Sequence, residues 1–257
     1  MQLERGIGIS VLPRFRPTLL ARAELYLNSG VERSQGCFTA RADWKLPNQE
    51  EWRLLTAQEA AVPVNRSDRI ELFEIPSHLH KQWHATAQQL PTHSAGRSEE
   101  YERFVASLAS FFLFKKVPVE NCSFTVLATE PPHRSAFAGP GSLAGLRIGS
   151  APESPLLAVN LGDGPTALVA LNLPIRRMRE LVVTEGMKEE LPSDITQRFM
   201  ELFPDYPLVR LVLPSRHGVR FFPDAVAHEG ARANQNGLDV VLRISGTANV
   251  HLQSGAR

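Results

Sequence analysis

The sequence is short of several features that mark well-defined classes of protein. It has two cysteines, Cys37 and Cys122, and they do not form a CxxC pair. Two isolated cysteines cannot build a disulfide framework, so we expect reduced thiols in a reducing compartment. Charge of one sign is also lacking, because 28 Lys and Arg residues stand against 27 Asp and Glu residues. A net charge of +1 with no long basic run argues against a nucleic-acid partner.

Long apolar runs and common catalytic motifs are missing as well. No stretch approaches the roughly 20 apolar residues that span a bilayer. Charged residues also interrupt residues 1–25, where a signal peptide would need a continuous apolar segment. We therefore expect a soluble, cytoplasmic protein with no membrane partner. The phosphate-loop motifs GxGxxG and GxxxxGK[ST] do not occur, and neither does the GxSxG elbow of serine hydrolases. Neither cysteine lies in a cysteine-protease motif.

The clearest helical pattern lies over residues 99–114. Its apolar side chains recur at three- and four-residue intervals and form one broad face. They are Tyr101, Phe104, Val105, Leu108, Phe111 and Phe112. Ser98 can cap the first turn, and Pro118 lies just beyond the last one. A second pattern predicts a helix over residues 194–203.

Most of the other periodic segments have the length and alternation of strands. They lie at residues 69–75, 123–127, 156–160, 167–171, 208–213, 218–222, 225–228 and 239–245. Between two of them, Gly162-Asp163-Gly164 has the composition of a hairpin turn. The segment of alternating charge at residues 176–190 predicts a solvated helix and turn.

These elements predict a mainly β fold with flanking helices (α+β), arranged as an antiparallel barrel or jelly roll. A length of 257 residues and a hydrophobic content of 43% fit a single globular domain. We expect residues 1–95 to flank the barrel, residues 96–246 to form it with its supporting helices, and residues 247–257 to be a tail.

Residues 211–230 and the strand that follows them carry most of the functional signal. Two strands separated by a turn lead into a short segment that ends at His228, and Arg243 stands alone in the apolar run 240–244. An arginine in an apolar strand is costly to bury unless an anion meets it. A guanidinium that shares an interior with an imidazole is therefore a candidate carboxylate anchor, because it binds carboxylate through two parallel hydrogen bonds.

This arrangement resembles the last strands of the iron(II)- and 2-oxoglutarate-dependent oxygenases, which have a double-stranded β-helix, cupin-like fold. Members of that family carry an H-x-D/E motif, then a distal histidine, then an Arg or Lys on the next strand. The resemblance covers roughly residues 95–246 and implies that His133 and His228 bind Fe(II). It also implies that Arg243 holds the far carboxylate of 2-oxoglutarate, with no catalytic residue beyond the metal ligands. The central segment 157–173, with its VNLG turn, looks like a hairpin of some members.

The sequence departs from the family pattern at Ser135, which stands where the carboxylate of the H-x-D/E motif belongs. Iron(II) in such sites prefers two imidazoles and one carboxylate on one face. Three alternatives follow. A halide occupies the vacant position, as in related halogenases; another acid, such as Glu130 or Glu229, takes the carboxylate's place; or the site is inactive.

Each of these residues also has a structural interpretation. His133 follows a proline and fits a surface loop, and His228 fits a hydrogen-bonded core histidine. Arg243 fits one half of an ion pair with Asp239, Asp224 or Glu229. A competing metal site is offered by His78-Leu-His80-Lys-Gln-Trp-His84, with His93 nearby. His80 and His84 would share a helical face, which suits a divalent metal, but a solvated, histidine-rich start of a helix is the simpler interpretation.

The function that the sequence favours is an iron(II)- and 2-oxoglutarate-dependent oxidation, most simply a hydroxylation, of a small-molecule or amino-acid-like substrate. A halogenase-like enzyme with a two-histidine metal site is the nearest enzymatic alternative. A catalytically silent barrel that binds a ligand or a protein is the alternative from a different class.

Overall fold

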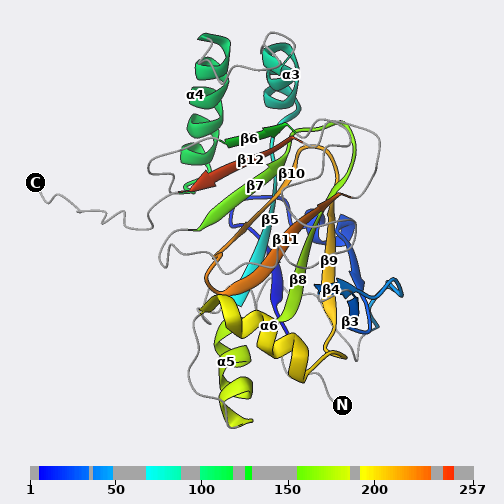
Figure 1. Cartoon of the computed structure of the whole chain (residues 1–257). Helices are drawn as coiled ribbons and strands as arrows, with labels where there is room; N and C mark the ends of the chain where they lie inside the picture. Colours follow the sequence, from blue (N-terminus) through cyan, green and yellow to red (C-terminus); the bar gives the residue numbers. More distant parts are fainter. Residues whose placement is uncertain are drawn as a thin grey trace, which may run out of the picture.

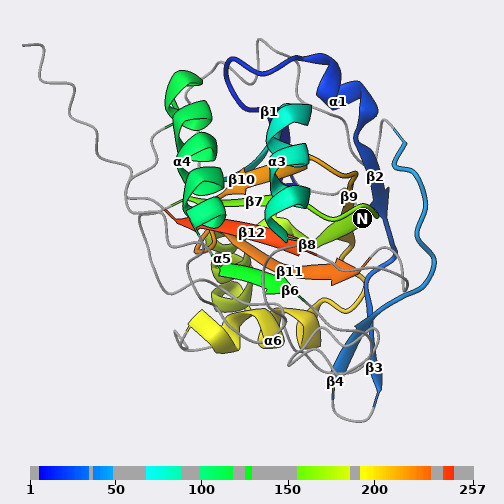
Figure 2. The same cartoon turned by 90° about the horizontal axis from the view of Figure 1, so that it is seen from above.

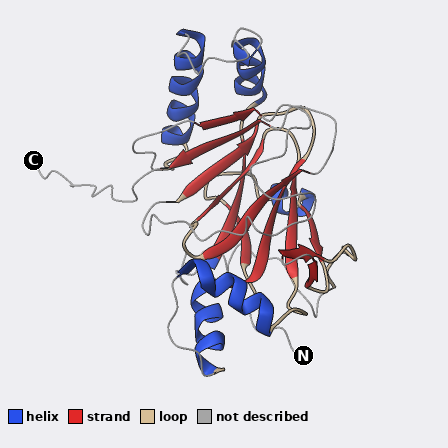
Figure 3. Cartoon of the chain, viewed as in Figure 1, coloured by secondary structure: helices blue, strands red, loops and turns tan. Residues whose placement is uncertain are grey.

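The computed structural model describes eight segments of the chain, which Figure 1 colours along the sequence and Figure 3 by type of element. They are residues 6–34, 37–48, 68–87, 99–117, 125–128, 155–185, 192–232 and 240–245. Together they form a mixed α+β structure in which two β-sheets lie between two pairs of helices (Figures 1 and 3). Within these segments, no helix is long and apolar enough to cross a membrane.

One sheet, called sheet A below, has six described strands in the order β1-β5-β10-β7-β12-β6. Their bounds are β1 Gly8–Val11, β5 Arg69–Glu74, β10 His217–Phe221, β7 Leu156–Asn160, β12 Val240–Ser245 and β6 Thr125–Ala128. Neighbouring strands are antiparallel except for the parallel pair β1 and β5. Strands from the N-terminal part of the chain therefore extend sheet A beyond β10.

The second sheet, sheet B, has four described strands in the order β11-β8-β9-β2, all antiparallel. Their bounds are β11 Val226–Arg232, β8 Thr166–Pro174, β9 Leu208–Leu213 and β2 Glu24–Leu27. A separate pair is formed by β3 Val31–Ser34 and β4 Cys37–Ala40. Sheets A and B share no described strand, so these strands form two sheets rather than a closed barrel.

Helices cover the outer face of each sheet. Against sheet A lie α3, Ser77–Ala87, and α4, Glu99–Phe114; against sheet B lie α5, Ile175–Thr184, and α6, Pro192–Leu202. The short helix α1, Thr18–Arg22, contacts β1 and β5. Figure 2 looks down on α3 and α4 and shows the strands of sheet A behind them.

The core is layered because every buried strand alternates its side chains between two faces. On β8, Leu168 and Ala170 pack between the sheets, whereas Val169 and Leu171 pack against α5 and α6. All nine residues of β8 are buried, because the strand has neighbours on both edges and layers on both faces. The continuously apolar composition of β8 follows from this position.

Gly218 marks a place where the packing of sheet A leaves no room for a side chain. It is the register partner of Phe73, and a Cβ atom there would lie 2.4 Å from the Phe73 ring and 2.6 Å from the Ala158 carbonyl oxygen. Glycine at this position therefore allows the Phe73 ring to lie directly against the backbone of β10.

Several elements match the sequence predictions. The helix predicted over residues 99–114 is α4 with the same bounds, and its residues Phe104, Leu108 and Phe112 are fully buried. The helix predicted over residues 194–203 corresponds to α6. Strands predicted at 156–160 and 208–213 are β7 and β9 with unchanged bounds.

The hairpin predicted around Gly162-Asp163-Gly164 is wrong. β7 belongs to sheet A and β8 to sheet B, so the turn carries the chain from one sheet to the other. The buried Asn160 side chain holds this turn: its Nδ2 donates to the carbonyl oxygens of Gly164 and Leu213, each at 2.8 Å, and its Oδ1 accepts from the Gly162 amide at 3.0 Å. The asparagine also ties the β7–β8 turn to the end of β9.

Candidate functional site

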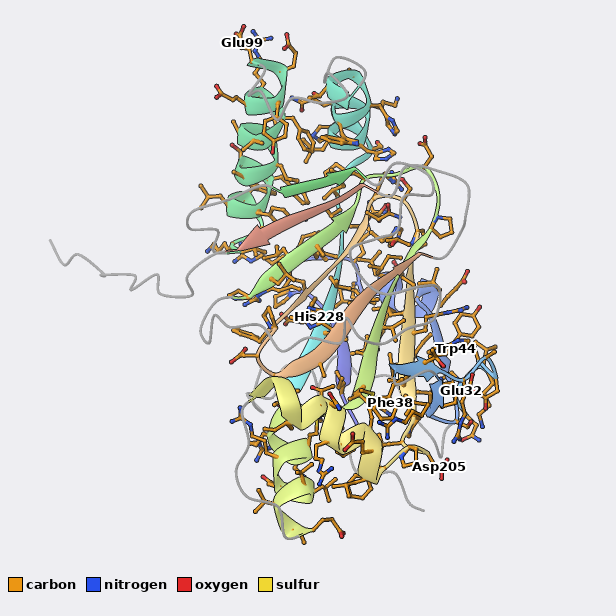
Figure 4. All side chains as sticks on the ribbon, viewed as in Figure 1. Glu32, Phe38, Trp44, Glu99, Asp205 and His228 are labelled. Atoms are coloured by element: carbon orange, nitrogen blue, oxygen red, sulfur yellow. The ribbon has the colours of Figure 1, made fainter. Side chains whose placement is uncertain are left out.

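His228 lies between the two sheets. It stands on β11 of sheet B, opposite Ala170 of β8, and its ring packs edge-on against Phe221 of β10 in sheet A, with ring centroids 4.5 Å apart (Figure 4). Its neighbour Val226 belongs to the core between the sheets, whereas Ala227 packs outward against the helices. The register of β11 shifts between Val226 and His228, but Ala170, the partner of His228, packs between the sheets, so His228 faces inward. The imidazole is half-buried.

A backbone contact orients the His228 ring. Its Nδ1 lies 2.8 Å from the Val226 carbonyl oxygen, which can only accept, so Nδ1 carries the proton and donates. In a neutral ring the lone pair then resides on Nε2. This arrangement, with one ring nitrogen donating to a backbone carbonyl, is the usual support of a metal-binding imidazole.

Arg243 occupies a position of β12 that belongs to the inner face of sheet A. Its register partner on β7 is Ala158, and paired residues lie on the same face of a sheet. Ala158 packs against the core between the sheets, whereas its neighbours Leu157 and Val159 pack outward against α3 and α4. The strand register thus assigns Arg243 to the face of sheet A that is turned toward sheet B.

Four other residues of the sequence-based site lie outside the described residues. They are His133, Ser135 and Glu130, together with Asp239, one of the acids considered as a partner of Arg243. The prediction that His133 and His228 converge on one iron ion stays a prediction.

A second group of potential ligands lies at the end of the sheets where β7 passes into β8. The Nε2 atoms of His80 and His84 are 3.2 Å apart, and Nε2 of His84 is 3.3 Å from Oδ1 of Asp163. One ligand atom from each of these three residues lies within 4.8 Å of the other two. The sequence interpretation of this histidine segment as a solvated helix start missed Asp163, which is far away along the chain.

Ordinary helix and turn geometry builds this second group. His80 and His84 are four residues apart on α3 and therefore share one face of the helix. Leu79 and Trp83, on the adjoining face, are buried against sheet A and fix the rotation of α3. Asp163 is presented by the turn that Asn160 holds.

The surroundings of His80 favour its neutral form. Burial, followed by repulsion from His84, lowers the pKa of His80 below its ordinary value, against the opposing effects of the Leu161 carbonyl and Asp163. The neutral imidazole is the form that accepts a hydrogen bond or binds a metal ion.

Comparison with known proteins gives few matches. No family model matches the chain, and no curated protein matches it. Two solved structures are similar to it. Both are crystal structures of the Kdo hydroxylase KdoO, a non-haem Fe(II) α-ketoglutarate-dependent dioxygenase, one in complex with succinate and Fe(III) and the other with cobalt(II).

The similarity to these two structures is distant. The first has 12% sequence identity and a TM-score of 0.40, covering 73% of this chain and 82% of the other. The second has 13% identity and a TM-score of 0.37, covering 73% of this chain and 83% of the other. At this level, function has to be inferred from the residues of this chain itself.

Proposed function

We propose that the chain is a non-haem iron(II)- and 2-oxoglutarate-dependent oxygenase with a jelly-roll fold, acting on a small-molecule or amino-acid-like substrate. The observation that carries the proposal is the pairing of two positions on facing sheets. His228 points inward from β11 with its Nδ1 proton donated to a carbonyl, and the next strand, β12, has Arg243 at an inner-face position.

The strand order supports the jelly-roll part of the proposal. From β7 to β12 the chain visits sheets A, B, B, A, B and A, so successive strands keep crossing between the two layers. A double-sheet jelly roll is built in this way. In such a fold, strands that follow one another in sequence bring their inward-facing residues together across the core.

The residues fit the cofactors that the proposal requires. His228 presents an imidazole in the tautomer that leaves the lone pair on Nε2, and imidazole suits iron. An arginine at an inner-face position of a strand needs an anionic partner, and a carboxylate of 2-oxoglutarate would supply one. His133 would provide the second imidazole. Bound iron would supply the oxidising chemistry, while the chain would hold the cosubstrate and exclude water.

The test is the binding of Fe(II) and 2-oxoglutarate together under anaerobic conditions, read from the weak visible charge-transfer band of the ternary complex. We expect the native chain to give the band and His228→Ala to lose it. Arg243→Ala should weaken 2-oxoglutarate binding while Fe(II) still binds. No band in the native chain, or an undiminished band in His228→Ala, would overturn the proposal.

His217→Ala is the matched control for His228→Ala. His217 stands on β10, and its Nδ1 lies 3.0 Å from the Ser215 carbonyl oxygen, which repeats the backbone contact of His228. It lies four residues along β10 from Phe221, the ring that His228 contacts, which is about 13 Å at about 3.3 Å per residue. The control should keep the band.

Ser135→Asp addresses the missing carboxylate. If the position is vacant, the new carboxylate should raise Fe(II) affinity and remove any effect of chloride. Glu229 is the register partner of Val169, which packs toward α5 and α6, so its position belongs to the outer face of sheet B. If Glu130 already completes the site, the same change crowds it and should lower 2-oxoglutarate consumption. A catalytically silent barrel would bind iron more tightly without consuming 2-oxoglutarate.

A further inference from the structure

The group formed by His80, His84 and Asp163 has no part in the proposed oxygenase chemistry. It lies on the helix side of sheet A, where α3 meets the β7–β8 turn and the β9–β10 turn. His80 Nε2 has three polar neighbours: the Ser215 hydroxyl at 2.9 Å, His84 Nε2 at 3.2 Å and the Leu161 carbonyl oxygen at 3.3 Å.

Hydrogen bonds alone cannot satisfy these contacts. The contact with the Leu161 carbonyl requires a proton on His80 Nε2, because a carbonyl oxygen only accepts. The contact with a carboxylate oxygen of Asp163 requires a proton on His84 Nε2 for the same reason. The contact between the two Nε2 atoms requires that only one of them carries a proton. No assignment of protons meets all three conditions.

A cation between the three residues removes the conflict. Two ligand atoms of a tetrahedral zinc ion, each about 2.0–2.1 Å from the metal, lie about 3.3–3.4 Å apart. Two of the three separations match this value: 3.2 Å for His80 Nε2 to His84 Nε2 and 3.3 Å for His84 Nε2 to Asp163 Oδ1. The ligand atoms of the third pair, His80 and Asp163, lie within 4.8 Å of each other. With the metal in place both nitrogens turn lone pairs toward it, so the contacts among His80, His84 and Asp163 need no proton. The Leu161 carbonyl would then adjoin the ion or its bound water instead of accepting from His80.

We propose that His80, His84 and Asp163 bind a divalent transition-metal ion of the zinc class. Two imidazoles and one carboxylate suit such an ion, whereas Mg²⁺ and Ca²⁺ prefer ligand sets made of oxygen. The Ser215 hydroxyl and the Leu161 carbonyl adjoin His80 and lie within reach of the remaining coordination position or of a water molecule there.

The loop that brings Ser215 to His80 is itself tightly held. Arg216 has a left-handed backbone with φ of 69°, which is uncommon for a residue other than glycine. Its amide donates to the Asn160 carbonyl at 2.8 Å, and its guanidinium pairs with Glu74 at 2.6 Å. The turn is thereby fixed to β7 and β5, and Ser215 is presented to α3.

The metal ion would join α3 to the β7–β8 turn. Asp163 is largely exposed, and the His84 side chain is 38% exposed, so an ion can enter from solvent without opening the core. The link between α3 and sheet A then adds a metal bond to the apolar contacts of Leu79 and Trp83. The bound metal should consequently raise the midpoint of thermal unfolding.

The experiment measures Zn²⁺ bound by the metal-free chain in competition with a chromophoric chelator. We expect His84→Ala and the nearly isosteric Asp163→Asn to lower Zn²⁺ affinity at this site by about tenfold or more. In His84→Ala the zinc stoichiometry should fall by one per chain, and the rise of Tm with Zn²⁺ that belongs to this site should be lost. Circular dichroism checks that each variant is folded.

His78→Ala is the matched control, because His78 is an exposed histidine on the same helix that is not one of the three ligands. It should keep the native stoichiometry and an affinity within about twofold. The proposal is overturned if His84→Ala and Asp163→Asn bind as much Zn²⁺ as the native chain. It is equally overturned if His78→Ala loses as much as His84→Ala, since zinc would then bind histidines on α3 without a built site.

Discussion

At the scale of single residues, removing one partner of the ion pair between Glu71 and Arg220 should destabilise the fold more than removing one partner of an exposed pair. The two residues are register partners on β5 and β10, 3.0 Å apart, and their side chains are only 12% and 11% exposed. Arg220 also has an Nε without a hydrogen-bond partner and stacks over Phe222. The Glu71 carboxylate is therefore the main compensation for the positive charge of Arg220.

Glu71→Ala should lower the free energy of unfolding by about 3–5 kcal/mol, because it leaves a mostly buried guanidinium without its partner. Arg103→Ala, which removes one half of an exposed pair with Glu99 on α4, should cost less than about 0.5 kcal/mol. Denaturant unfolding measures both. Equal losses in the free energy of unfolding would mean that burial does not determine the cost of breaking the Glu71–Arg220 pair.

The residues of the two sites differ in how far the sequence could reveal them. The placement of His228 on a strand could be anticipated, because a strand is a local pattern, but its inward direction depends on the pairing with Ala170 after a register shift in β11. Asp163 could not be joined to His80 and His84 in that way, because only the packing of α3 on sheet A brings the turn to the helix. Neither the glycines beside Asp163 nor the spacing of the histidines contains that information.

At the scale of elements, α4 shows how a helical face becomes part of the core. Phe104, Leu108 and Phe112 follow one another at four-residue intervals and are all fully buried against sheet A and α3. Leu113, in the last turn of the same helix, is 73% exposed. The two leucines therefore have the same chemistry and opposite environments.

Leu108→Ala should lower the free energy of unfolding by about 2–5 kcal/mol, because it opens a cavity in a closely packed cluster. Leu113→Ala should change it by less than about 0.5 kcal/mol. Chemical denaturation with a common m-value tests the pair. A small loss for Leu108→Ala would show that the cluster between α4 and sheet A collapses around the deletion.

Element positions were easier to predict than element partners. The bounds of α4, β7 and β9 follow from periodicity and from flanking proline or glycine, which are local signals. The error at Gly162-Asp163-Gly164 concerned pairing instead. Glycine and aspartate permit a tight turn, but distant strands decide whether the chain returns in the same sheet. Here β7 lies between β10 and β12, and β8 lies between β9 and β11.

At the scale of the whole molecule, the sequence favoured sheets with flanking helices, and the described residues form that arrangement. It did not indicate that β1, β2 and β5 would extend the sheets, because short strands near the N-terminus carry no signal of their partners. It also did not reveal that the two candidate metal sites lie on different faces of sheet A. His228 lies between the sheets, whereas His80 and His84 belong to α3, which packs on the other face of sheet A.

The distance between the two sites predicts that each binds its metal ion independently of the other. Ala170, the register partner of His228, lies four residues along β8 from Thr166, where the strand leaves the turn that holds Asp163. Those four steps span about 13 Å at about 3.3 Å per residue. Sites separated by more than about 7–10 Å without shared partners usually contribute additively.

We therefore expect His228→Ala to leave Zn²⁺ affinity at the His80–His84–Asp163 site unchanged within about twofold, and His84→Ala to leave the Fe(II) and 2-oxoglutarate band unchanged. In the double variant the two losses should add, because sheet A separates the two groups. Titration of the native chain, both single variants and the double variant completes the cycle. A coupling larger than about 1 kcal/mol would show instead that the turn between β7 and β8 transmits occupancy of one site to the other along β8.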